Sequence, residues 1–131
     1  MDIRKAKRLA EKYLAKVEEI YGYSKFHECS PYLEFEKSIY SRYSGMDNDW
    51  HKCEEDDTPE AEYDFLSNAI IIYYRNIQDE EHLAKTIIHE YQHYLQSPSW
   101  MTRYYRMGYC YSDHPYEIAA YEEEKNYKKV C

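Results

Sequence analysis

The sequence predicts an α+β fold in a single domain, residues 1–131. Three observations lead to this prediction: an amphipathic helical pattern over residues 2–21, a run of β-branched residues over 69–75, and helical patterns over about 79–97 and 115–128. We therefore expect an N-terminal helix, a small mixed β-sheet, a helix that carries two histidines four residues apart, and a C-terminal helix that carries glutamates. The chain is long enough to bury a modest core.

The first predicted helix is amphipathic. Its apolar residues recur with the 3.6-residue period of an α-helix and include Ile3, Leu9, Tyr13, Leu14 and Val17. Gly22 follows them, and glycine is typical of the position just after a helix. The basic side chains between the apolar ones predict a solvated face rather than a surface for nucleic acid.

The middle of the sequence predicts strands and one loop. Residues 32–43 fit either a strand or a helix, and we favour the strand. Residues 45–61 are rich in Asp and Glu. Because their spacing does not match an EF-hand loop, we expect a solvated surface loop rather than a calcium site. Residues 62–66 and 69–75 predict two further strands joined by a short turn.

A five-residue motif in the next predicted helix indicates metal chemistry. His89, Glu90 and His93 form the pattern HExxH, and residues four apart lie on one face of a helix. Two imidazoles placed in this way can bind one Zn²⁺ through nitrogens at about 2.0–2.1 Å. Glu90 lies about 100° round the helix, where it can reach a water on the metal without binding the metal itself. Asp79 is expected to cap this helix, and Pro98 to end it.

The apolar pattern of the same helix supports the motif. One stripe consists of Leu83, Ile87, Tyr91 and Tyr94. His89, His93 and Gln96 flank this stripe, so one face of the helix can pack in the core while its edge lines a cleft. The alternative is an amphipathic helix with two surface histidines and no metal.

The segment after this helix predicts two more helices. Residues 99–107 form a short helix that ends at Gly108, and residues 110–114 form a loop. The last helix begins near Pro115, because proline is typical of the first helical turn, and extends to about Lys128.

A catalytic zinc usually has three protein ligands and a water, and the motif provides two of them. A third histidine at the metzincin spacing is excluded, because Gln96 and Ser99 occupy the positions of its glycine and histidine. The candidates further along the chain are Asp113, His114, Glu117, Glu122, Glu123 and Glu124. Glu117 fits best, since it lies in the first turn of the last helix and the small Ala120 on the same face lets two helices approach closely. The glutamates at 122–124 are expected to face solvent.

The HExxH motif, followed by Glu117 and Ala120 on a second helix, resembles the gluzincin metallopeptidases. The small size of the chain resembles the minigluzincins and other compact zincin-like proteins, including those encoded by phages and other viruses. The similarity covers about residues 69–124. It implies a zincin-like core in which an active-site helix and a glutamate helix meet beside a small mixed sheet. It also implies that an edge strand, here residues 69–75, pairs with an extended substrate.

The predicted activity is hydrolysis of peptide bonds with one catalytic Zn²⁺ held by His89, His93 and Glu117. Glu90 acts as the general base, which takes a proton from the attacking water and passes it to the leaving nitrogen. Tyr121, one turn beyond Glu117, is the first candidate for a donor to the oxyanion.

Further side chains near the predicted site have candidate roles. Tyr111, Tyr116 and His114 are alternative oxyanion donors, and Asp113 can orient a ligating histidine. Packing is the alternative role for any of the 18 tyrosines.

The four cysteines are not arranged as CxxC, which predicts free thiols. Compact gluzincins can be held inactive by their termini. That resemblance implies a Cys131 thiolate near the metal, and the alternative is a free thiol on a frayed tail.

Composition restricts the classes of function. The net charge of -8 argues against general nucleic-acid binding. No apolar run approaches the length of a transmembrane helix, and the N-terminal segment lacks the apolar centre of a signal peptide, so we expect a cytoplasmic protein without a membrane partner. The expected partner is a protein or peptide substrate. Two alternatives stay open: a catalytically silent zinc-binding module with a regulatory or protein-binding role, and a small helical interaction protein with a fortuitous HExxH.

Overall fold

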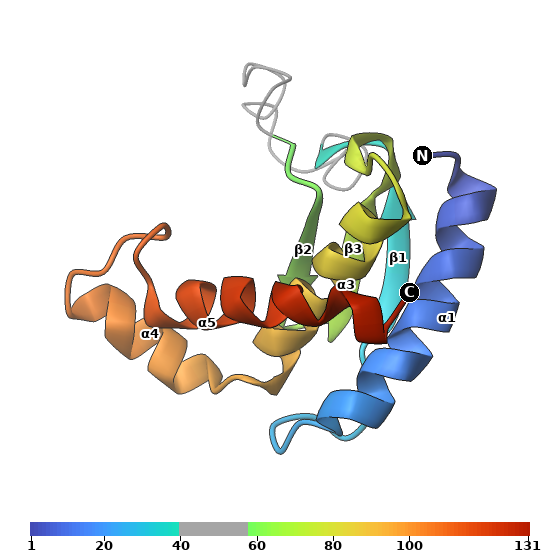
Figure 1. Ribbon diagram of the computed structural model, residues 1–131. Helices are drawn as coiled ribbons and strands as arrows, with labels where there is room; N and C mark the ends of the chain where they lie inside the picture. The colour runs from blue at the N-terminus through green and yellow to red at the C-terminus, as the bar shows by residue number, and fades with distance from the viewer. Residues whose placement is uncertain (40–57) are drawn as a thin grey trace.

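The computed structural model describes residues 1–39 and 58–131 and has an α+β architecture with a small mixed sheet, as predicted (Figure 1). In chain order the elements are α1 (Ile3–Tyr21), β1 (Tyr32–Glu36), β2 (Ala61–Asp64), β3 (Ala69–Tyr73), the 3-10 helix η3 (Tyr74–Asn76), α3 (Glu80–Leu95), α4 (Pro98–Arg106), α5 (Pro115–Glu123) and the 3-10 helix η4 (Glu124–Lys129). The end of the predicted first strand and most of the predicted acidic loop lie outside the described residues.

β3 is the central strand of the sheet. Within the described residues the strand order is β1-β3-β2, with β1 parallel and β2 antiparallel to β3. Tyr32 pairs with Ala69 on one side of β3, and Ala61 pairs with Ile72 on the other. The expected edge position of residues 69–75 is therefore wrong, because β3 has a strand on each side. Its uninterrupted apolar run is typical of a strand buried on both faces.

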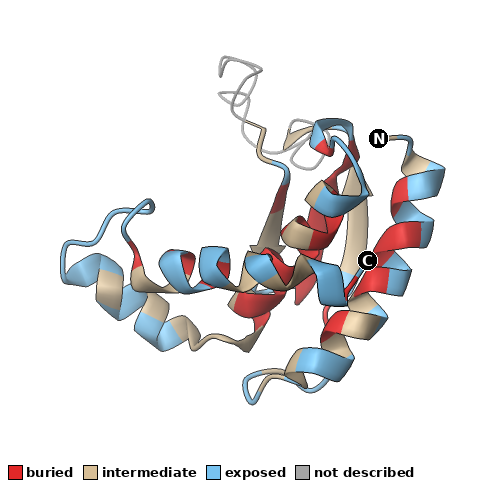
Figure 2. Cartoon of the chain, viewed as in Figure 1, coloured by how far each residue is buried: buried red, intermediate tan, exposed pale blue. Residues whose placement is uncertain are grey.

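The two faces of β3 pack against different parts of the protein. All five residues of the strand are buried (Figure 2). Ile70 and Ile72 belong to the main core with helices α1 and α3, whereas the alternate residues form a second buried cluster against Ile39. This division follows from the two-residue period of a strand.

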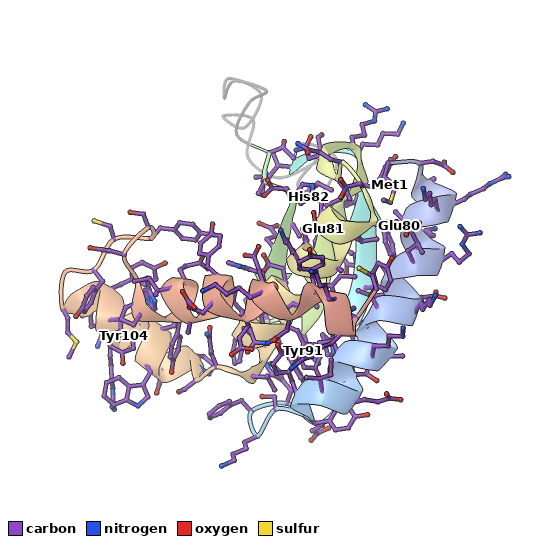
Figure 3. The ribbon with its side chains drawn as sticks, viewed as in Figure 1. Met1, Glu80, Glu81, His82, Tyr91 and Tyr104 are labelled. Carbon is purple, nitrogen blue, oxygen red and sulfur yellow. The ribbon has the colours of Figure 1, made fainter. Side chains whose placement is uncertain are left out.

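Helices α1 and α3 share the main core with one face of the sheet. α1 contributes Leu9, Ala10, Tyr13 and Val17. The stripe predicted for α3 is confirmed, since its four members are all fully buried: Leu83, Ile87, Tyr91 and Tyr94. The Tyr91 hydroxyl, on the part of α3 nearest the end of α1, donates a hydrogen bond to the Gly22 carbonyl (Figure 3). This bond connects the end of α1 to the C-terminal part of α3.

The predicted start of α3 is confirmed, and its end is two residues earlier than predicted. Asp79 Oδ1 accepts a hydrogen bond of 2.8 Å from the His82 backbone N–H, as expected for an N-cap. At the other end α3 stops at Leu95. Ser97 instead caps α4, because its hydroxyl accepts a hydrogen bond from the backbone of α4 and Pro98 takes the first helical position.

The last two α-helices bring the chain back to α3. α4 has no buried residue, whereas α5 lies across α3 and buries Glu117 and Ala120 (Figure 1). The last predicted helix does not stay α-helical to Lys128, because the chain changes to the 3-10 helix η4 at Glu124. Of the described helices, none combines the length and the apolar character needed to cross a membrane.

Candidate metal centre

Three side chains predicted as ligands meet between α3 and α5. His89 and His93 come from α3, and Glu117 comes from the first turn of α5. His89 Nε2 lies 3.2 Å from one carboxylate oxygen of Glu117, and His93 Nε2 is in direct contact with the other. One ligand atom from each of the three side chains lies within 4.8 Å of the other two. The three side chains therefore form a group that can hold a metal ion.

The side chains of this group are largely buried. His89 is 7% exposed and Glu117 is 4% exposed. Ala120 is fully buried, as expected for a small residue that lets α5 approach α3. Burial lowers the local dielectric constant, so charges within the group interact more strongly than they would in water.

The second ring nitrogen of each histidine has its own acceptor. His89 Nδ1 lies 2.9 Å from Glu124 Oε2, and His93 Nδ1 lies 2.7 Å from Gln96 Oε1. Both contacts leave Nε2 facing Glu117. Histidines that bind metals usually donate their other N–H to such an acceptor, which fixes the tautomer and the ring orientation. The donor set of two imidazole nitrogens and one carboxylate is therefore suited to a metal ion such as Zn²⁺.

Contacts between charged groups shift the pKa values of all three side chains. Burial alone would lower the pKa of His89, but its hydrogen bonds with Glu117 and Glu124 outweigh burial and raise the pKa to about 10. Burial would also lower the pKa of His93, but its contacts with nearby carboxylates, mainly Glu117, raise that pKa. Burial would raise the pKa of Glu117, but the two histidines lower it to about 2. The Glu117 carboxylate thus favours the protonated form of both imidazoles, and a cation bound at Nε2 would take the place of a proton there.

Two cavities meet at Glu90. The larger has a volume of about 480 Å³, within the range of ligand pockets, and is also lined by His93 and Glu117. The smaller, of about 170 Å³, is also lined by His89 and Glu124. The group of three ligands therefore borders open space on two sides.

The walls of the larger cavity are mainly apolar away from the ligands. On the side of β2 they include Ala61, Tyr63 and Phe65, together with one charged residue, Glu62. On the side of α4 they consist of Pro98, Met101 and Tyr105. An apolar cavity with a few polar groups at one end is typical of a binding site for an organic ligand.

Glu90 is a buried carboxyl beside the three ligands. It is 8% exposed, and burial raises its pKa to about 7, although the charges of His93 and His89 act in the opposite direction. It is not one of the three grouped ligands, but it lines both cavities next to them. A pKa near neutrality suits a general base at physiological pH.

Tyr111, in the loop before α5, and Tyr121, on α5, lie at different positions beside the ligands. Tyr121, the first candidate for an oxyanion donor, is 57% exposed, and its ring lies edge to face against His89 with 4.6 Å between the ring centroids. It lines the smaller cavity only. Tyr111 is 63% exposed and lines both cavities, and burial of its hydroxyl together with the charges of Glu117 and Glu90 raises the pKa of that hydroxyl. Of the two, Tyr111 borders the larger cavity.

The other candidate side chains hold the backbone around the site. His114 is 1% exposed, its Nδ1 accepts a hydrogen bond from the Tyr116 N–H, and its Nε2 lies 3.1 Å from the Met101 carbonyl. Because backbone groups engage both ring nitrogens, His114 is not placed as a ligand or as an oxyanion donor. Tyr116 packs against His114. Asp113 accepts a hydrogen bond from the Cys110 N–H and does not orient a ligating histidine.

The sequence did not predict two side chains that contact the ligating histidines, Glu124 and Gln96. Glu124 was expected to face solvent, and that expectation is wrong, because its carboxylate contacts His89 and its side chain is only 23% exposed. Its spacing contained a signal: Glu124 follows Glu117 by seven residues, which is two turns along the same helical face. Gln96 follows His93 by three residues, a spacing at which side chains on a helix are neighbours.

The described cysteines are free thiols outside the metal centre. Cys29, Cys110 and Cys131 are exposed and form no disulfide. This confirms the predicted free thiols for these three residues, and Cys53 lies outside the described residues. No described cysteine belongs to the ligand group, and the backbone N–H of Cys131 bonds to the Tyr127 carbonyl in η4. Cys131 is therefore not placed as a further ligand.

Fold and site together define an α+β protein with a candidate His-His-Glu metal centre. Comparisons of the chain with protein-family models, with curated proteins and with solved structures gave no match. A function for this protein therefore has to be argued from the chemistry of the site itself.

Proposed function

We propose that the protein is a zinc-dependent peptidase in which Glu90 is the general base. The observation that supports this most directly is the position of Glu90, a buried carboxyl with a pKa of about 7 that lines the cavity beside the three ligands. Structural zinc sites usually have four protein ligands, whereas three ligands with an open position are typical of catalytic sites. Membership of the zincin-like class and a cytoplasmic location are parts of the same proposal.

The residues of the site support each step of peptide hydrolysis. Zinc held by His89, His93 and Glu117 would supply Lewis acidity, polarising the peptide carbonyl and lowering the pKa of water from 15.7 to about 7. Glu90, at the junction of the two cavities, would take the proton of the attacking water and pass it to the leaving nitrogen. Glu124 and Gln96 would hold the two histidines in the orientation that ligation requires.

A tyrosine is the best donor for the developing oxyanion. We assign this role to Tyr111 ahead of Tyr121, because Tyr111 lines the larger cavity together with Glu90 and Glu117, whereas Tyr121 packs against the His89 ring and lines only the smaller cavity. A hydroxyl that stays protonated can donate to an oxyanion, and the raised pKa of Tyr111 keeps its proton in place.

The larger cavity favours a peptide with a bulky apolar side chain close to the scissile bond. Apart from Glu62, the residues that β2 and α4 contribute to its walls are mainly apolar or aromatic, and burying a leucine or phenylalanine side chain contributes about 1.5–3 kcal/mol. β2 lies at the edge of the described sheet and borders this cavity, so an extended peptide that pairs with β2 would run past Glu90. The expected substrate is therefore an extended, partly apolar segment of a peptide or protein.

Metal analysis combined with peptide cleavage tests the proposal. The purified protein should contain one zinc per chain, and His93→Ala should lose it. A mixture of unstructured peptides, analysed by mass spectrometry, should be cleaved by the zinc-loaded protein. Glu90→Gln should keep the zinc and cleave about 10²–10⁴ times more slowly, because it lacks the general base.

Two other results would identify different functions. A protein that contains stoichiometric zinc but leaves the peptides intact would be a catalytically silent module. In that case Glu90→Gln should bind a partner as well as the wild type does. Protein without stoichiometric zinc, even after incubation with the metal, would reject both zinc functions and favour an interaction protein with a fortuitous motif.

A further inference from the structure

Gln96 connects the two helices that carry the metal ligands. It is the residue that ends α3, and it lines the larger cavity. Its amide oxygen is 2.7 Å from His93 Nδ1, and its amide nitrogen donates a hydrogen bond of 3.1 Å to the Tyr116 carbonyl. One side chain therefore contacts a ligand on α3 and, on α5, the residue that immediately precedes the ligand Glu117.

The chemistry of an amide fixes the direction of both hydrogen bonds. The Tyr116 carbonyl can only accept, so the NH₂ group of Gln96 must face it and the amide oxygen must face His93. An amide oxygen only accepts, so His93 Nδ1 must carry a hydrogen. The nitrogen of His93 left to bind a metal is then Nε2, which is the nitrogen that contacts Glu117.

Other side-chain types of similar length could not make both bonds. A carboxylate, like that of Glu124 beside His89, accepts from a histidine but has no hydrogen to donate to a carbonyl. A hydrocarbon chain makes neither bond. The backbone of Gln96 is also held in place, because its N–H bonds to the Gln92 carbonyl in the last turn of α3.

We propose that Gln96 is a positioning residue of the metal centre, which holds His93 in the tautomer that ligates through Nε2 and holds the start of α5, with Glu117, against α3. This role rests on the metal site of the proposed function but does not depend on peptide cleavage. Loss of a contact of this kind typically lowers metal affinity about 10–100-fold.

Zinc affinity, measured by competition with a chelator, tests this role. Gln96→Met keeps most of the side-chain length but loses both hydrogen bonds, and its affinity should fall about 10–100-fold. Gln96→Glu keeps the acceptor for His93 but loses the donor to the Tyr116 carbonyl, so its affinity should lie between those of Gln96→Met and the wild type. Gln92→Met is the matched control on the same helix, since Gln92 Nε2 is buried without a hydrogen-bond partner in the described part of the chain. Its affinity should stay at the wild-type level.

The state of the His93 ring gives a readout that a purely structural role would not change. Long-range ¹⁵N–¹H spectra of the zinc-loaded protein should show zinc at Nε2 and a hydrogen at Nδ1 of His93 in the wild type and in Gln96→Glu. Gln96→Met should also show His93 rings in a second state, with a different assignment of zinc and hydrogen to the two ring nitrogens. If Gln96→Met does not fold, Gln96→Asn takes its place with the same expected loss, because its amide is one methylene shorter.

Two results would overturn the role of Gln96. One is wild-type zinc affinity in Gln96→Met, and the other is an affinity of Gln96→Glu no higher than that of Gln96→Met. Wild-type protein that binds zinc but cleaves no peptide would reject the proposed peptidase and leave the role of Gln96 intact.

Discussion

Two glutamates on the last helical segment contact different sides of the same histidine. Glu117 lies against Nε2 of His89, whereas Glu124 lies against Nδ1. A carboxylate at Nδ1 makes the imidazole a more basic ligand and fixes its ring plane. Glu124 should therefore contribute to metal affinity without touching the metal.

Replacing Glu124 by alanine should lower zinc affinity about 10–100-fold, because His89 would lose the acceptor that orients it. Glu122→Ala is the control, since Glu122 is exposed and its carboxylate contacts Lys125. Isothermal titration of zinc into both variants measures the difference. Equal affinities in the two variants would contradict the role of Glu124.

The pKa of His89 predicts how pH acts on the metal-free protein. It is about 10 in the folded protein, against an ordinary value of 6.5. The charged ring therefore stabilises the fold below about pH 6.5, and this contribution is lost as the pH rises towards 10. The thermal midpoint of the metal-free protein should fall across that interval. Zinc binding at pH 7 should release protons, because the ring must be neutral to ligate.

Calorimetry measures both effects of pH. Scans between pH 6.5 and 10 give the thermal midpoint, and zinc titrations in two buffers of different ionisation enthalpy give the number of protons released. A heat of binding that is the same in both buffers would contradict the charged state of His89.

At the level of single residues, the sequence predicts the three grouped ligands and the neighbouring carboxyl better than it predicts their supports. His89, Glu90 and His93 follow from fixed spacing on one helix, and the small Ala120 points to Glu117. The contact of Glu124 with His89 and the hydrogen bond from Gln96 to the Tyr116 carbonyl depend on how closely the last helices approach α3. That distance is set by tertiary packing and has no local sequence pattern.

Among the elements, β2 and α4 both contribute mainly apolar or aromatic side chains to the walls of the larger cavity. Met101 lies on the α4 wall, while Met107 at the end of the same helix is 65% exposed and does not line the cavity. The two methionines allow the volume of the cavity to be changed with a control on the same helix.

Met101→Trp should reduce cleavage of peptides with a bulky apolar side chain at least about tenfold relative to peptides with a small one, because the indole fills part of the cavity. Met107→Trp should leave that ratio unchanged. Competitive cleavage of a peptide mixture, followed by mass spectrometry, measures the ratio. An unchanged preference in Met101→Trp would show that this cavity does not select the substrate.

The central position of β3 predicts a large effect of truncation there. Ile71 is fully buried in the cluster on the second face of β3, so Ile71→Ala should reduce the free energy of unfolding by about 2–5 kcal/mol. Leu66→Ala, in the turn before β3, should change it by less than about 0.5 kcal/mol, since Leu66 is 94% exposed. Urea denaturation measures both values. Similar losses in both variants would contradict the central position of β3.

Helices were predicted more completely than the sheet, for a physical reason. The periodicity of α1 and α3 is local, and the buried residues confirm it. Strand order depends on pairing between distant segments, such as β1 with β3, so the sequence does not reveal which strand is central. The change from α5 to η4 at Glu124 likewise follows from packing of the chain end against α3 rather than from a capping signal.

Over the whole molecule, burial is distributed unevenly (Figure 2). α1, α3 and β3 contain most of the buried apolar side chains, and α4 contains none. Its hydrogen bonds to the rest of the chain include the one between the Met101 carbonyl and His114 Nε2. Segments with few buried contacts open at a lower free energy than the core.

Two ligands precede α4 in the sequence and one follows it, and this order has a consequence for the motion of α4. An ion bound to His93 and Glu117 would close residues 94–116 into a loop, as a disulfide closes the chain between two cysteines. Backbone amides of α4 should then exchange with deuterium faster in the metal-free protein than with zinc, while those of α1 stay unchanged. Identical exchange in α4 with and without zinc would contradict this coupling. The ion would thus act as a crosslink that sets the rigidity of one wall of the substrate cavity.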